Sequence, residues 1–108
     1  MIQLTVLYGK PQDPATFDRH YQETHAKLAQ RIPGLKGFII NKPASLDPQE
    51  SSPYYLIADL YFENMAALQA ALQSPEGQAA AGDLQSFASG GATLLAGEVQ
   101  VFNQASIG

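Results

Sequence analysis

Cysteine is absent from this chain of 108 residues, and lysine and arginine together number only six. A chain without cysteine has no disulfide framework, no thiolate nucleophile and no cysteine-based metal site. The six basic residues are outnumbered by ten acidic ones, for a formal net charge of -4. They cannot build the positive stripe that binding to nucleic-acid phosphates requires. We therefore expect no nucleic-acid partner.

Long apolar runs and the common cofactor motifs are also missing. No apolar run approaches the roughly 20 residues that span a bilayer, and the start, MIQLTVLYGK, lacks the features of a signal peptide. The sequence contains no G-x-G-x-x-G or Walker glycine loop, no H-E-x-x-H zinc motif and no G-x-S-x-G nucleophile elbow. We therefore expect a cytoplasmic protein that makes no membrane contact and binds neither a cofactor nor a metal ion.

The apolar residues that are present predict a single α+β domain. Their alternation predicts strands, and cap residues mark the helices: Asp13-Pro14 begins the first and Ser74-Pro75-Glu76 restarts the second. The second helical region is either one bent helix or two helices in sequence. This order is that of a ferredoxin-like βαββαβ fold with a four-stranded antiparallel sheet. The predicted strands are 2–8, 35–40, 54–62 and 92–102, and the predicted helical regions are 13–32 and 63–87. The predicted domain comprises residues 1–103, and residues 104–108 form a short tail.

The predicted strand YYLIADLYF, at residues 54–62, is apolar on both of its faces. Leu56 and Leu60 lie on one face, and Ile57 and Tyr61 lie on the other. Two helices cover only one face of such a sheet, and each large apolar side chain left in water forfeits roughly 1.5–3 kcal/mol of burial. We therefore predict a homodimer that packs through a sheet face. The alternative is a half-exposed sheet on which tyrosines and alanines are tolerated in contact with water. The sequence leaves open which face meets the helices and which meets the second copy.

His20 and His25 are the only histidines and the first candidates for chemistry. On a regular helix, Phe17, Tyr21 and Leu28 form an apolar stripe. His25 lies about 50° from the centre of this stripe and His20 about 90° away on the opposite flank, so the two histidines are about 140° apart. His25 is therefore expected to face inward as a general acid or base, while joint metal binding is not expected. Tyr21 could offer its hydroxyl to a substrate. The alternative for His25 is a structural imidazole at the core margin.

Asp59 is a further catalytic candidate, because a carboxylate inside an apolar strand is costly unless it is paired. Its expected donor is a tyrosine hydroxyl, a lysine or His25, and a pair with His25 would fix the imidazole tautomer. The alternative is an acid that faces solvent or pairs with a basic side chain across the sheet. Four aromatic residues are candidates for substrate binding, with ordinary core or interface packing as the alternative: Phe38, Tyr55, Tyr61 and Phe87.

Several short motifs occur together and in order along the chain. They are Y-G-K-P at 8–11, Y-x-x-x-H at 21–25, P-G-L at 33–35, S-P-E-G at 74–77 and F-A-S-G-G at 87–91. The combination resembles the EthD family of small dimeric α+β-barrel proteins, and the likeness covers nearly the whole chain. The family is named for accessory proteins of ethyl tert-butyl ether degradation, so the resemblance implies a fold more than an activity.

The resemblance implies a pocket between the helices and the sheet of each subunit. The wider barrel superfamily includes isomerases, cyclases, quinone-forming monooxygenases and haem-degrading enzymes. His25 and Tyr21 match the family motif by position, which implies proton transfer during isomerisation, cyclisation or cofactor-free oxidation of a small apolar or aromatic ligand. The alternative is a non-catalytic accessory or carrier protein of a degradation pathway. A thiol proton donor is impossible without cysteine, and nothing else in the sequence supports haem at His25.

Overall fold

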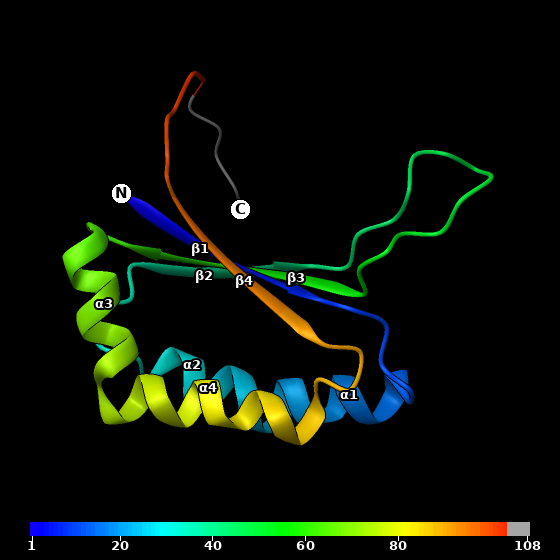
Figure 1. Cartoon of the computed structure of the whole chain (residues 1–108), viewed down its shortest axis with the longest axis horizontal. Coiled ribbons are helices and arrows are strands. Elements are labelled where there is room, and N and C mark those ends of the chain that lie inside the picture. The colour runs from blue at the N-terminus through cyan, green and yellow to red at the C-terminus, as the bar shows by residue number, and fades with distance from the viewer. Residues whose placement is uncertain (104–108) are drawn as a thin grey trace.

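The computed structural model describes residues 1–103 and has two layers, a four-stranded sheet with helices on one face (Figure 1). The strand order is β2-β3-β1-β4, and every neighbouring pair is antiparallel. This arrangement confirms the predicted ferredoxin-like α+β fold. The strands are β1 (Ile2–Tyr8), β2 (Gly37–Asn41), β3 (Leu56–Phe62) and β4 (Ala92–Glu98). The helices are α1 (Pro14–His20), the π-helical turn η1 (Tyr21–His25), α2 (Ala26–Gln30), α3 (Met65–Gln73) and α4 (Pro75–Phe87).

The second helical region consists of two helices that meet at a corner on Ser74. The Ser74 hydroxyl accepts a hydrogen bond from the Gly77 N–H at 3.0 Å and donates one to the Ala71 carbonyl. Pro75 begins α4, where its missing N–H costs nothing. A Cβ at Gly77 would overlap the Ala71 carbonyl oxygen. The S-P-E-G motif therefore encodes the α3–α4 corner.

A close backbone contact joins the end of β1 to the turn before β4. The Gly9 N–H donates to the Gly91 carbonyl at 3.0 Å, and a Cβ at Gly9 would overlap the Gly90 carbonyl oxygen. The glycines of the Y-G-K-P and F-A-S-G-G motifs are therefore neighbours in space. This contact holds Tyr8 beside Phe87, with ring centroids 5.7 Å apart.

The two faces of the sheet differ in what covers them. Alternate residues of β1 and β3 face the helices and are buried in the core, among them Tyr8, Leu56 and Phe62. The intervening residues of the same strands are only half-buried. Strand β4, at the sheet edge, is mostly exposed, and it ends at Glu98 rather than at the predicted residue 102. The helices therefore cover one face and leave the other open.

Two segments extend from the open face of the sheet, away from the helices (Figure 1). They are the loop between β2 and β3 and the segment that follows β4. Leu46 in the loop is fully exposed, and Phe102 after β4 is 93% exposed. The open face therefore lies between two projecting arms that carry apolar side chains.

The predicted tail at 104–108 lies outside the described residues. Within residues 1–103, none of the helices has the length and apolar character needed to span a bilayer.

Candidate functional site

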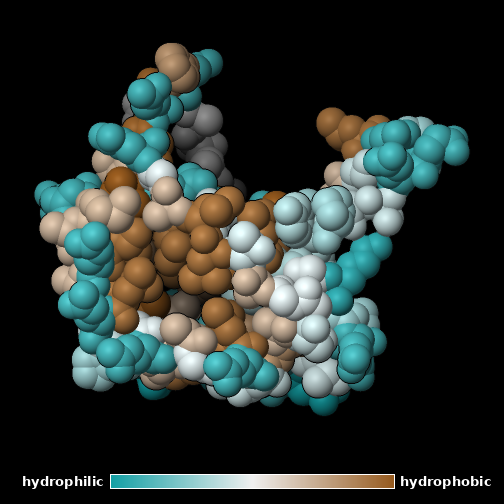
Figure 2. All heavy atoms as spheres, viewed as in Figure 1, coloured by the Kyte–Doolittle hydropathy of each residue, from teal (hydrophilic) through white to brown (hydrophobic). Residues whose placement is uncertain are grey.

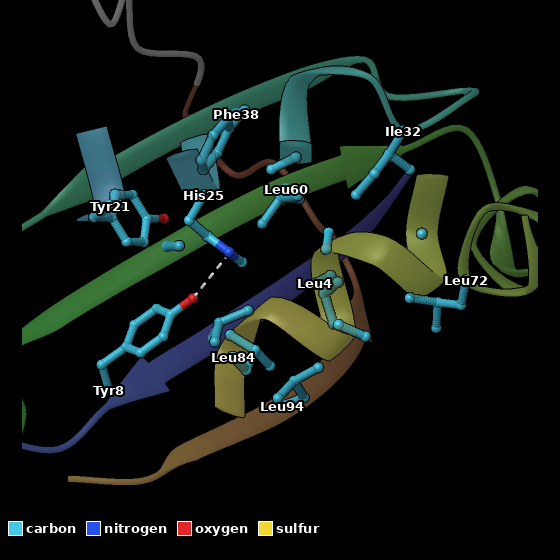
Figure 3. A pocket seen from close by; sticks show the side chains of 16 residues that line it. Leu4, Tyr8, Tyr21, His25, Ile32, Phe38, Leu60, Leu72, Leu84 and Leu94 are labelled. Carbon is cyan, nitrogen blue, oxygen red and sulfur yellow. Dashed lines mark hydrogen bonds between the residues drawn. The ribbon is translucent and has the colours of Figure 1, made fainter. Parts of the chain in front are cut away.

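A narrow hollow lies between the sheet and the helices, within an apolar stretch of surface (Figure 2). Leu72 of α3 and Leu94 of β4 line it and are themselves partly exposed, so they flank its mouth. Among residues 1–103, its polar lining comes only from Tyr8, Tyr21 and His25, and no charged side chain lines it (Figure 3). The cavity volume is about 50 Å³, compared with about 150 Å³ for an engineered apolar cavity that binds benzene. A ring-sized ligand would therefore extend into the mouth or displace side chains there.

His25 is the buried polar side chain of this hollow, with 6% exposure. Its Nδ1 lies 3.0 Å from Oδ2 of Asp83, and its Nε2 lies 3.4 Å from the Tyr8 hydroxyl. Because a carboxylate only accepts hydrogen bonds, Nδ1 carries the proton and Nε2 presents its lone pair. The contact to Tyr8 is longer than an ordinary hydrogen bond, so a ligand can replace it at little cost.

Burial controls the protonation of all three polar groups in the hollow. Burial lowers the pKa of His25 below its ordinary value of 6.5, and the hydrogen bond to Asp83 opposes this only in part. The imidazole is therefore neutral at pH 7 and able to accept a proton. Burial raises the pKa of both Tyr8 and Tyr21 far above the ordinary value. Their hydroxyls stay protonated and serve as hydrogen-bond donors.

The π-helical turn η1 places His20 beside the same carboxylate. The Ala26 N–H donates to the carbonyl of Tyr21, five residues back. This wider turn aligns residues five apart, which a regular helix would set on different sides. The Nε2 of His20 consequently lies 2.9 Å from both oxygens of Asp83. The prediction that the two histidines face different directions was wrong, because it assumed a regular helix.

Two of the predicted aromatic residues lie at or near this site. Phe38 lines the hollow. The Phe87 ring packs against both imidazoles, with centroids 4.8 Å from His25 and 4.9 Å from His20. Phe87 therefore forms a wall behind the histidines rather than part of the lining. Substrate binding by either residue stays a prediction.

Asp59, Tyr61 and Tyr55 lie elsewhere. Asp59 is on the open face of the sheet and accepts hydrogen bonds from Thr5 at 2.9 Å and Gln3 at 3.2 Å. The expected tyrosine, lysine or His25 donor was therefore wrong, because the cross-strand neighbour supplies the partner. Tyr61 shares that face by strand alternation. The Tyr55 hydroxyl donates to Asp18 at 2.9 Å, away from the hollow.

Sequence reasoning missed two members of the site, Asp83 and Tyr8. Asp83 lies in an alanine-rich stretch of α4, and its partners come from a segment about sixty positions earlier. A lone carboxylate in such a stretch was the available signal. Tyr8 looked like any other core residue of the first strand, although its hydroxyl contacts His25.

These features define a class, the ferredoxin-like α+β proteins with an apolar hollow between helices and sheet. Within this class, the chain belongs to the EthD family, because the EthD domain matches residues 10–91. An uncharacterised 11.0 kDa protein encoded between thcB and thcC in Rhodococcus erythropolis is 50% identical over 95 residues. That match covers 88% of this chain and 91% of the relative.

Solved structures agree with this assignment. An EthD family protein from Bacillus halodurans is 36% identical with a TM-score of 0.86, over 93% of this chain and 99% of that one. SnoaB from Streptomyces nogalater, a cofactor-independent oxygenase, is 16% identical with a TM-score of 0.68, over 95% of this chain and 97% of that one. Three further structures of this fold, 14% to 22% identical, are described as dimeric. At such low identity the likeness shows the fold alone.

Proposed function

We propose that the protein binds a small, neutral, apolar molecule in the hollow and that His25 removes a proton from it. The observation that carries this proposal is the state of the His25 ring. Asp83 accepts from Nδ1 at 3.0 Å, which leaves the lone pair of Nε2 directed at the hollow. Burial keeps the ring neutral by lowering its pKa. A buried, oriented and neutral imidazole is suited to act as a general base.

The lining of the hollow supports a neutral ligand. No lysine or arginine among the described residues lines it, so a carboxylate or phosphate would enter without a matching cation. Three polar groups, Tyr8, Tyr21 and His25, lie among apolar side chains. A fitting ligand has an apolar body and one carbonyl or hydroxyl group that reaches these three.

The proposed step is proton abstraction. Nε2 of His25 takes a proton from an acidic C–H or O–H bond, and the bonding electrons stay on the ligand as an enolate or phenolate. The hydroxyls of Tyr8 and Tyr21 donate to the new oxyanion. Return of the proton to another carbon gives an isomerisation, and attack of the enolate carbon on a carbonyl of the same molecule gives a cyclisation. Electron transfer from the anion to dioxygen, followed by combination of the carbon radical with superoxide, gives a peroxide that takes the proton back from His25. This is a cofactor-free oxidation with dioxygen as the co-reactant, and SnoaB is described as a cofactor-independent oxygenase.

A carrier or accessory role is the second candidate function. The largely apolar lining favours it, because such a surface holds an apolar intermediate whether or not a proton moves. Exchange measurements separate the two functions. The α-hydrogens of cyclohexanone, a small neutral ketone, exchange with D₂O when a base forms its enolate, and NMR follows their loss.

We expect the protein to accelerate this exchange above the buffer rate. His25→Gln should abolish the acceleration, and Thr24→Ala, at an exposed neighbouring position, should leave it unchanged. The acceleration over the buffer rate should be smaller for the bulkier ketone 2-tetralone, whose buffer rate is measured separately, because of the small cavity. Exchange of cyclohexanone at the buffer rate, with binding still visible in chemical shifts, would contradict proton transfer and support the carrier role.

We also propose that two copies pair through the open face of the sheet. That face carries apolar residues such as Ile39 and Leu95, which are 40% and 57% exposed in one copy. The arms that carry Leu46 and Phe102 border it. The descriptions of structural neighbours as dimeric support this pairing. A two-fold arrangement would bury the same surface on both copies.

A further inference from the structure

We propose that the ligand of the hollow is a neutral, unbranched alkyl ketone that lies lengthwise, with its carbonyl group at the His25 end. This inference rests on the proposed function and names the substrate class for the same site. The observation that carries it is the shape of the hollow, which is long, narrow and polar at one end only. The ends are defined by contacts between residues that line the hollow.

The polar groups of the hollow lie together at one end. The Tyr8 hydroxyl lies 3.4 Å from Nε2 of His25, and the Tyr21 ring packs against the His25 ring with centroids 5.2 Å apart. Figure 3 shows these three side chains on the left of the view and Ile32 and Leu72 on the right. Beyond the three polar groups, every lining residue within 1–103 is apolar. A carbonyl group therefore finds hydrogen-bond donors at one end alone.

Helix α4 runs along the hollow and gives its length. Asp83 accepts from His25 at 3.0 Å, which places the adjacent Leu84 at the polar end. A Cβ at Gly77 would lie 3.0 Å from the Cα of Leu72, which places Gly77 at the apolar end. Leu84 and Gly77 both line the hollow and are about 10 Å apart at the rise of an α-helix.

Strand β1 agrees with this length, and the volume shows that the hollow is narrow. Tyr8 and Leu4 both line it and are about 13 Å apart at the rise of a strand. A cavity volume of about 50 Å³ over such a length leaves little width. A single file of methylene groups displaces the mouth residues Leu72 and Leu94 less than a ring does. The shape therefore favours a chain.

The polar end favours an uncharged head group. The Tyr8 and Tyr21 hydroxyls can donate to a carbonyl oxygen, because burial raises the pKa of both and keeps them protonated. No lysine or arginine among the described residues lines the hollow. Octanoate, which has a carboxylate head, should therefore bind more weakly than the ketone 2-octanone, which has the same number of carbon atoms. Tighter binding of octanoate would overturn the neutral head.

NMR titration with a series of methyl ketones tests the chain. Each methylene group that the hollow buries should strengthen binding by up to about fourfold. The dissociation constant should therefore fall from 2-butanone through 2-hexanone to 2-octanone. Cyclohexyl methyl ketone has as many carbon atoms as 2-octanone but carries a ring, so it should bind more weakly than 2-octanone. Equal or tighter binding of the cyclohexyl compound would overturn the inference.

Ala81 of α4 provides a variant that shortens the hollow. It lines the hollow between Leu84 and Gly77 and is exposed, so a larger side chain there does not crowd the core. Helical side chains tilt toward the N-terminus, so the side chain of Ala81→Leu would extend toward Gly77. We expect this variant to remove most of the gain in affinity from 2-butanone to 2-octanone. Ala79→Leu, at an exposed position that does not line the hollow, should keep the gain. An undiminished gain in Ala81→Leu would contradict the proposed placement of the chain.

Deuterium exchange separates this inference from the proposed function. The acceleration over each ketone's own buffer rate should rise with chain length, and His25→Gln should abolish it for every ketone. Chain-dependent binding without accelerated exchange would support the ligand class and refute proton transfer. Accelerated exchange that does not depend on chain length would refute the ligand class and leave His25 as the base.

Discussion

Two carboxylates, one on each side of the sheet, obtain their hydrogen-bond donors in different ways. On the open face, Asp59 accepts from Thr5, its direct cross-strand neighbour on β1, and from Gln3 on the same strand. On the covered side, Asp83 of α4 accepts from two histidines of another helical segment. In the cluster on the open face, the carboxylate and both of its hydrogen-bond donors belong to strands of the sheet. The second cluster connects separate helices and leaves one imidazole nitrogen directed at a hollow, so the chemistry that we propose belongs to the covered side.

Phe62 and Tyr61 are adjacent on β3 and point to opposite faces, which makes them the strongest test of this difference. Phe62 is fully buried against the helices, whereas Tyr61 is only partly covered in one copy. We expect Phe62→Ala to lower the free energy of unfolding by about 3–5 kcal/mol, because it leaves a cavity in the core. Denaturant titration at a dilution where copies separate should show a much smaller loss for Tyr61→Ala. Equal losses would mean that the faces are equally packed in one copy.

The open face should instead control association. We expect light scattering of the wild type to give about twice the chain mass of 11.6 kDa. Leu95→Lys places a charge on this face and should dissociate the pair, since symmetry brings two such lysines into one apolar interface. Gln22→Lys, on the exposed surface of η1, should leave the mass unchanged. A wild type that stays monomeric at micromolar concentration would contradict the pairing.

Exchanging each carboxylate for an amide compares the two clusters directly. Asp83→Asn should slow cyclohexanone exchange roughly 100-fold or more, because an asparagine can donate to Nδ1 and favour the wrong tautomer of His25. Asp59→Asn should have little effect, because Asp59 lies on the other side of the sheet. The reverse ranking in NMR exchange rates would contradict the role proposed for Asp83 and favour Asp59 as the partner of the proposed base.

The smallest effect is the pH dependence of stability. Burial lowers the pKa of His25, so below about pH 6.5 the unfolded chain binds a proton that the folded chain does not. The free energy of unfolding should fall with decreasing pH, from 6.5 to the lowered pKa, by at most about 1.4 kcal/mol per pH unit from this group. His25→Gln should flatten this part of the curve. Asp13 and Asp18, whose hydrogen bonds lower their pKa below 3.8, act only in more acidic solution.

Much of the fold could be predicted because its signals are local. Alternation located the four strands, and Asp13-Pro14 and Ser74-Pro75 marked true helix starts. The inward direction of His25 also followed, because the residue borders the apolar stripe of its own helix. The family motifs were informative for a physical reason as well, since Gly77 and Gly9 lie where backbones meet too closely for a Cβ.

The site was less predictable, because its geometry depends on one irregular turn and on one distant partner. A regular-helix projection separated His20 from His25, and η1 reverses that result. Asp83 could not be matched to either histidine without knowing that α4 packs beside α1 and η1. Asp59 was a catalytic candidate because it is an acid in an apolar strand, but the register of β1 and β3 places it opposite Thr5.

Local chemistry along the chain thus specified the order of elements, the helix caps and the inward direction of one histidine, since each depends on neighbours a few positions away. Packing between layers decided which face of the sheet is covered, which carboxylate orients His25 and where His20 points. Those outcomes depend on contacts between segments about sixty positions apart and on a widened helical turn. Such contacts exist only after the helices have settled on the sheet.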